Sequence, residues 1–311
     1  MLLRPDGDPF LLFDSGSSPE RVVIFGTPGC VRVLQNAHVW SSDGTFKAAP
    51  RLWVQVYTIH ALVSGFLIPC AYALLPNKTT ETYATMWNAI RAQVGDEAAD
   101  ADRLLTVDFE QASINAASAA FPRMTFAGCY FHLGQSVYRN LQQHGLQAKY
   151  ASDPEFKLRV KMLSAIAFLP IEDAVAGFDM LDPLFENDEQ DLLGYFERTY
   201  VGRRAGAGRR PPLFRIDLWN VHNRMGAGAL RTNNAVEAFH NGFSSGVAVG
   251  YHPPVWAFVE SLHSQQNITD KDLVDIDGGA VKLPDKKQEA RNARLWTLVG
   301  RYLESIKMTL G

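Results

Sequence analysis

The sequence predicts an α/β protein in which helices flank both faces of a mixed β-sheet. Three features support this prediction. Strand-like segments follow one another closely near the N-terminus, helical and strand-like segments then alternate, and a long stretch with almost only helical signals comes next. The length of 311 residues suits one large domain or two ordinary ones, since single cores stop growing at ~250 to 300 residues.

The strand predictions rest on short segments rich in β-branched and aromatic residues. Segments 38–46, 52–62 and 65–76 are separated only by short breaks, which predicts an antiparallel meander. The apolar run in 103–109 predicts a buried strand, and 123–131 predicts another.

Helices are predicted between and after these strands. Residues 79–94 place Tyr83, Met86, Trp87 and Ile90 at helical spacing behind a threonine. Helical patterns also span 109–121 and 132–145. Three meander strands followed by helix, strand, helix and strand is the order of the ribonuclease-H-like fold.

The rest of the chain divides into further predicted parts. Residues 133–230 give helical signals and are interpreted as an all-helical insertion that precedes a helix containing Glu237. A polar segment, 267–288, predicts a loop. The predicted domains are a core of 1–132 and 231–266, the insertion of 133–230, and a polar loop with a C-terminal helix over 267–311.

Composition excludes several classes of protein. Hydrophobic content of 47% and charged content of 20% are typical of a soluble globular chain. A net charge of -3 argues against non-specific nucleic-acid binding as the main role. Three widely spaced cysteines predict a reducing compartment. No segment approaches the ~20 apolar residues of a membrane helix, so we expect an intracellular protein without a membrane partner.

Two aspartates interrupt predicted strands. Asp43 lies in or at the end of the first strand, and Asp108 ends the fourth. Each alone is more often a turn or strand-end residue, and Asp43-Gly44 is a common turn dipeptide. A buried acid is costly unless it is paired or binds a cation. Because the first and fourth strands are neighbours in a ribonuclease-H-like sheet, both carboxylates are expected at one end of it.

Glu237 is the third acid, within RTNNAVEAFHNGF. The spacing of Asn234 and Glu237 fits a capping box, and the functional alternative is a metal ligand on a helix that crosses the same sheet end. Converging carboxylates repel one another unless divalent cations compensate their charge. Oxygen ligands suit Mg²⁺ or Mn²⁺, and two such ions ~3.5 to 4 Å apart can promote phosphoryl transfer.

Six blocks in order then carry a resemblance: DGTFKAAP, VYTIHA, LLPNKTTETY, VDFEQASINA, GCYFHLGQSVYRN and RTNNAVEAFHNGF. Between about residue 22 and about residue 266 the chain resembles the catalytic domain of Mutator-like element transposases, the MULE transposase domain. The resemblance implies an Asp-Asp-Glu triad of Asp43, Asp108 and Glu237 that serves as both metal ligands and catalytic residues.

The resemblance also implies a reaction and partners. Water would cut DNA at the element end, and the freed 3′-hydroxyl would attack target DNA. The implied partners are double-stranded DNA, as transposon ends and target, and further copies of the chain in a homo-oligomer. The implied location is the nucleus.

Further residues support the site in this interpretation. Cys129 and His132 match the C-x-x-H element of the family; a structural role is favoured over a zinc site, because Cys30 and Cys70 lack the spacing of further ligands. His240 follows Glu237 by three residues, and either supports the metal ligands or is structural.

Candidate DNA contacts are arginines. Arg139 lies on the same predicted helix face as His132. A second set lies in the Gly/Pro-rich segment 201–215, where a solvated loop is the more common interpretation and a DNA-backbone contact the functional one. Its members are Arg203, Arg204, Arg209 and Arg210.

A different class of function stays open. Related transposases usually have a zinc-binding DNA-recognition module before the catalytic domain, whereas this sequence begins close to the domain. A separate DNA-recognition protein is therefore an expected partner. The alternative is a domesticated or truncated transposase-derived protein that acts as a non-catalytic nuclear DNA-binding or regulatory scaffold, and an inactive gene product is a third hypothesis. Trp219 and Trp256 are predicted to be core residues rather than base-stacking ones.

Overall fold

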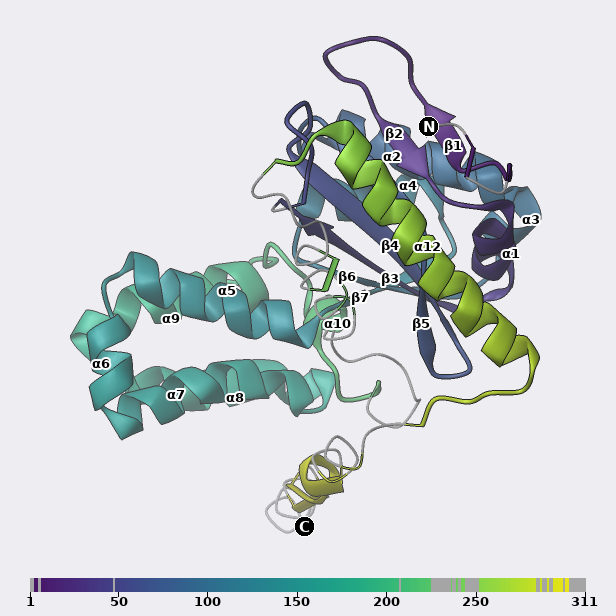
Figure 1. Cartoon of the computed structure of the whole chain (residues 1–311). Coiled ribbons are helices and arrows are strands. Elements are labelled where there is room, and N and C mark those ends of the chain that lie inside the picture. The colour runs from purple at the N-terminus through teal and green to yellow at the C-terminus, as the bar shows by residue number, and fades with distance from the viewer. Residues whose placement is uncertain are drawn as a thin grey trace. The chain divides into compact units, whose positions relative to one another are not determined.

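The computed structural model divides the chain into two compact units (Figure 1). Unit 1 comprises Met1–Phe126 and Asn233–Leu283, and unit 2 comprises Ala127–Thr232 and Pro284–Gly311. The described residues are 3–4, 7–46, 48–206, 208–224, 236, 239, 242–243, 252–283, 286, 290, 293–298 and 300–301. Among them, every helix is too short or too polar to cross a membrane.

A mixed sheet forms the centre of unit 1. In the part of the chain that the structure describes, seven strands follow the order β1-β2-β5-β4-β3-β6-β7. Neighbours from β1 to β3 pair antiparallel, whereas β3 and β6 pair parallel. The strands are β1 (Leu11–Asp14), β2 (Val23–Phe25), β3 (Val39–Thr45), β4 (Gln55–Val63), β5 (Phe66–Leu75), β6 (Arg103–Val107) and β7 (Met124–Gly128). The predicted α/β class is confirmed, and the sheet is compatible with a ribonuclease-H-like fold.

The predicted meander is strands β3, β4 and β5. Ser64 and Gly65 join β4 to β5, and both have positive φ, 48° and 81°, as a two-residue hairpin turn requires. A Cβ on Gly65 would overlap the carbonyl oxygen of Lys282. Only glycine therefore fits this turn without displacing the neighbouring backbone.

Helices lie on both faces of this sheet (Figure 1). On one face α2 packs against α4, and the buried rings of Tyr83 and Trp87 meet Tyr57 edge to face at 5.5 and 6.1 Å. On the other face lies α12. The helices of unit 1 whose bounds lie within the described residues are α1 (Pro28–Asn36), α2 (Thr80–Val94), α3 (Asp96–Ala99), α4 (Gln111–Ala120) and α12 (Val255–Asp277).

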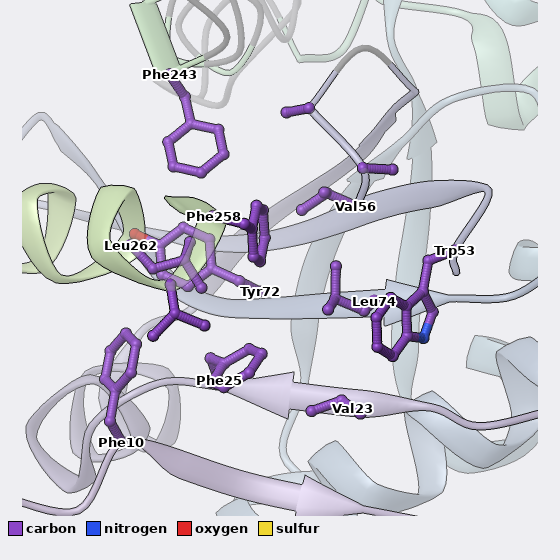
Figure 2. Packing of buried hydrophobic residues seen from close by; sticks show 13 residues of the cluster. Phe10, Val23, Phe25, Trp53, Val56, Tyr72, Leu74, Phe243, Phe258 and Leu262 are labelled. Carbon is purple, nitrogen blue, oxygen red and sulfur yellow. The ribbon is translucent and has the colours of Figure 1, made fainter. Parts of the chain in front are cut away.

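An apolar cluster fills the space between α12 and the sheet (Figure 2). Phe258 and Leu262 of α12 meet side chains from β2, β4 and β5. The cluster includes Phe10, Val23, Phe25, Trp53, Val56, Tyr72, Leu74, Phe243, Phe258 and Leu262.

Three sequence predictions need correction or addition. The loop predicted over 267–288 is wrong for 267–277, because α12 continues to Asp277. The buried face of α12 includes the polar residues Gln266 and Thr269, so the buried positions of this helix do not form an apolar stripe in the sequence. Trp256 is 66% exposed, since α12 packs through Phe258 and Leu262; its predicted core position is wrong. Strands β1 and β2 were missed because they span only four and three residues.

Unit 2 is helical apart from a two-stranded hairpin, within the residues that the structure describes. Buried Trp219, as predicted, belongs to its core together with Phe178, Phe196 and Tyr200. The helices of unit 2 with bounds inside the described residues are α5 (Tyr130–Gln143), α6 (Gln147–Ser152), α7 (Pro154–Ala165), α8 (Ala174–Leu181), α9 (Gln190–Phe196) and α10 (Ile216–Trp219). Short 3-10 helices lie at Ile166–Phe168, Ile171–Asp173, Asp182–Leu184 and Asn187–Glu189, and a short π-helix at Glu197–Val201. The hairpin joins β8 (Arg204–Ala205) to β9 (Gly208–Arg209).

Candidate active site

Asp43 lies inside strand β3 and is 6% exposed. Its Oδ1 accepts a hydrogen bond of 2.8 Å from the backbone N–H of Gly44. A Cβ at Gly44 would lie 2.6 Å from Oε1 of the buried Gln55. The glycine after the aspartate therefore lets β3 lie close to the Gln55 side chain.

Asp108 directly follows strand β6. In the parallel β3–β6 ladder Trp40 pairs with Leu105, and Ser41 with Thr106. The ladder ends there; Asp43 and Asp108 each lie two residues beyond this last pair, and the charge of Asp43 raises the pKa of Asp108. The predicted adjacency of the strands that carry the two aspartates is thus confirmed, and both acids belong to one end of this strand pair.

The electrostatic state of Asp108 follows from this position. Burial, the negative charge of Asp43 and that of Glu110 raise the pKa of Asp108 from 3.8 to about 7, in this order of size. The ammonium of Lys78 and the backbone N–H of Glu110 act in the opposite direction. Asp108 Oδ1 is buried and has no hydrogen-bond partner among the described residues.

These carboxylates fit a hard divalent cation. An ionised carboxylate that is buried without a partner is costly in the metal-free protein, and a nearby second carboxylate adds repulsion. A cation bound by oxygen atoms of Asp43 and Asp108 would remove both costs. Asp43 and Asp108 are therefore candidate ligands of Mg²⁺ or Mn²⁺.

A polar network lies beside the two acids. The Tyr57 hydroxyl lies 3.0 Å from Ser42 Oγ and 2.9 Å from Ser113 Oγ, and Trp87 Nε1 donates to Ser113 Oγ at 3.4 Å. Burial and, next, the charge of Asp108 raise the pKa of Tyr57, so its hydroxyl stays neutral. The network ties β3 and β4 to α2 and α4. No periodic signal marks this network in the sequence, because its members come from distant segments.

Phe239, which lies two residues after Glu237 in the sequence, packs on β4, the strand next to the one that contains Asp43. The Phe239 ring lies 5.0 Å from the ring of buried His60. His60 Nε2 lies 3.0 Å from Thr58 Oγ1, and Thr58 is the register partner of Asp43. Glu237 and His240, the other predicted residues of this segment, lie outside the described residues.

The remaining predicted site residues belong to unit 2, whereas Asp43 and Asp108 belong to unit 1. Cys129 is buried at the N-cap of α5, His132 lies in the first turn of this helix, and Arg139 is exposed on it.

One other carboxylate cluster lies in unit 2. Within the described part of the chain, a single group of three or more close metal-binding side chains was found, Glu186, Asp188 and Glu189. Lys149 lies within 3.0 Å of all three, and Arg159 lies 2.6 Å from Glu189. These lysine and arginine charges neutralise the cluster, which is an ion-pair network.

The predicted DNA-binding arginines lie in and around the β8–β9 hairpin. Arg204 lies 2.7 Å from Asp179, and Arg209 pairs with both Asp179 and Glu197. Arg203 and Arg210 are exposed. Two of the four guanidinium groups are therefore held by carboxylates of the same unit.

The raised pKa of Asp108 gives a testable pH dependence. Between pH 3.8, the ordinary pKa of this carboxyl, and about pH 7, Asp108 holds a proton in the folded protein that the unfolded chain has released. The free energy of unfolding therefore falls as the pH rises through this range, and the loss is complete above about pH 7. Asp108→Asn should then gain stability relative to the wild type by up to about 1.4 kcal/mol per pH unit, levelling off above about pH 7. Denaturant unfolding in EDTA checks this, and a difference that is independent of pH would contradict the assignment.

Comparison with known families agrees with this geometry. Residues 39–136 match the family model described as the MULE transposase domain, a range that includes Asp43, Asp108, Cys129 and His132. No curated protein matches the chain. Residues 39–136 are therefore similar to the MULE transposase domain, which is consistent with a Mutator-like element transposase.

Proposed function

We propose that this chain is the catalytic core of a DNA transposase that cleaves and joins DNA strands with divalent metal ions. The observation that supports this most strongly is the adjacency of Asp43 and Asp108 on neighbouring strands β3 and β6 of the MULE transposase domain. Asp108 Oδ1, buried and without a hydrogen-bond partner among the described residues, is an oxygen atom available to a hard cation.

Asp43 and Asp108 would hold the ions, and Glu237 would complete an Asp-Asp-Glu triad. When bound, two Mg²⁺ or Mn²⁺ ions would supply charge stabilisation for the attacking and leaving oxygens of an in-line phosphoryl transfer. The protein's own part is to hold the carboxylates in place, which the β3–β6 pairing and the hydrogen bonds around Tyr57 do. Phe239, two residues after Glu237, packs on His60 of β4, so this segment of the chain reaches the strand that pairs with the one containing Asp43.

The wider proposal concerns architecture and partners. We interpret unit 1 as a ribonuclease-H-like catalytic core and the helical part of unit 2 as an insertion before Glu237. The substrates are double-stranded transposon ends and target DNA, handled in the nucleus by a homo-oligomer with a separate DNA-recognition protein. Arg139, Arg203 and Arg210 are candidate backbone contacts, with Cys129, His132 and His240 in supporting roles.

The proposed activity can be tested with supercoiled plasmid DNA. The purified protein should nick it in Mn²⁺, and EDTA should abolish the nicking because the two aspartates would then have no cation to hold. Nicking that persists in EDTA would indicate a different chemistry. A folded protein that binds DNA but never cuts it in Mn²⁺ would instead support the non-catalytic scaffold.

A further inference from the structure

Lys78, Phe46 and Glu110 come together beside the two aspartates. Phe46 follows β3 directly after the segment that contains Asp43, and Glu110 lies two residues after Asp108. Lys78 Nζ lies 2.8 Å from Glu110 Oε2 and 4.5 Å from the centroid of the Phe46 ring. Its positive charge also lowers the pKa of Asp108, so the ammonium acts electrostatically on the candidate metal site.

Hydrogen bonds of the neighbouring residues hold the backbone around Lys78 in place. Asn77 Oδ1 accepts bonds from the Thr79 backbone N–H at 3.0 Å and from Thr82 Oγ1 at 2.7 Å. Thr79 Oγ1 in turn accepts from the Thr82 backbone N–H at 3.3 Å, as the N-cap of α2. Lys78 is therefore held between two capping residues while its side chain stays 39% exposed.

A purely structural role explains this ion pair poorly. Ion pairs with a solvent-accessible partner contribute little to stability. Glu110 occupies the N-cap position of α4 and makes no side-chain capping bond there. Its carboxylate is directed to Lys78 instead.

DNA would have to approach this acidic site with its own negative charge. Asp43, Asp108 and Glu110 are all carboxylates, so a cation that contacts a phosphate at the edge of the site would offset part of the repulsion. The Lys78 ammonium is partly exposed and lies over an aromatic ring that is itself 46% exposed. Its pairing with Glu110 keeps it in place while no phosphate is present.

Resting on the function proposed above, we infer that Lys78 is a substrate-positioning residue that exchanges its Glu110 partner for a backbone phosphate beside the scissile phosphodiester of DNA. Glu110 is the counter-ion of the DNA-free protein, and Phe46 supports the ammonium in both states through a cation–π contact. The charge of Lys78 should then strengthen DNA binding, and the charge of Glu110 should weaken it.

Two variants should change affinity in opposite directions. Lys78→Gln should weaken binding about tenfold and make the dependence of log affinity on log salt shallower by about 0.9, since one phosphate contact is lost. Glu110→Gln should strengthen binding and leave that slope unchanged, because it removes only the competing carboxylate. Lys78→Arg keeps the charge and should bind as the wild type does. Fluorescence anisotropy of a labelled DNA duplex of arbitrary sequence, measured in Ca²⁺, gives both quantities.

A matched control lies in the same unit. Lys282 Nζ lies 5.7 Å from the centroid of the Phe66 ring. Phe66 is the first residue of β5, whereas Tyr72 lies in its second half. Tyr72 is the register partner of Thr58, which pairs with Asp43, and Phe66 lies six residues away, roughly 20 Å along the strand. Lys282→Gln makes the same change of charge and should alter neither affinity nor slope.

The outcomes separate this inference from the proposed function. If Lys78→Gln binds DNA like Lys282→Gln, or if the wild type binds no DNA, the inference is wrong. Thermal unfolding with Mn²⁺ reports on the metal site separately, and both the wild type and Lys78→Gln should be stabilised. Failure of Mn²⁺ to stabilise the wild type would overturn the proposed function, while the anisotropy comparison would still decide the role of Lys78.

Discussion

Asp108→Asn should reduce Mn²⁺-dependent DNA cleavage by at least about a thousandfold, because catalysis of phosphoryl transfer consists largely of positioning and charge neutralisation. The amide keeps the size of the side chain but loses the charge that would hold a cation. Asp108 is coupled to Asp43 across the β3–β6 pair, so the loss of either acid should disable the same site. A time course of plasmid nicking measures the effect.

Folding must be excluded as the cause of this loss. The metal-free Asp108→Asn protein should unfold at a temperature equal to or above that of the wild type, since the substitution removes a buried charge. An acidic-cluster control, Asp188→Asn in unit 2, should cut DNA at the wild-type rate because Lys149 already neutralises that residue. Cleavage by Asp108→Asn at the wild-type rate would contradict the assignment.

Arg103→Met should lower the free energy of unfolding by about 3 to 5 kcal/mol. Arg103 is 6% exposed at the start of β6, and its guanidinium donates to the carbonyl oxygens of Leu34, Gln35, Ala37 and Ala98. The first three oxygens belong to the last turn of α1 and the residue that follows it, where carbonyls have no partner within the helix. Methionine keeps an unbranched apolar stem but removes the donors to these oxygens, of which that of Leu34 has a second donor, the indole N–H of Trp40.

Denaturant unfolding measures this effect, and a surface arginine provides the control. Arg123 pairs with Asp102 at 2.8 Å, but the two side chains are 60% and 79% exposed. Arg123→Met should therefore cost about 0 to 1 kcal/mol. Equal losses for the two variants would show that the carbonyl contacts of Arg103 contribute little.

The sequence predicted the central part of the fold because its signals there are local. Close spacing of 38–46, 52–62 and 65–76 predicted the meander, and the apolar run before Asp108 predicted the buried strand β6. Their order then placed Asp43 and Asp108 on neighbouring strands, which the β3–β6 ladder confirms. The candidate site follows from strand order and not from any one motif.

Other features depend on tertiary contacts that periodicity does not report. Helix α12 continues through a polar segment because its buried face includes Gln266 and Thr269. The ion pair between Lys78 and Glu110 joins residues 32 positions apart, and the guanidinium of Arg103 reaches residues up to 69 positions away. No local sequence pattern predicts these polar contacts.

The central claim is that Asp43 and Asp108 together form a divalent-cation site. Calorimetric titration of Mn²⁺ into the wild type and into an Asp43→Asn/Asp108→Asn variant tests it most directly. We predict saturable binding to the wild type near pH 8, weaker binding below about pH 7 where Asp108 retains its proton, and no binding to the double variant. Equal binding to both proteins, or none to the folded wild type, would contradict the claim.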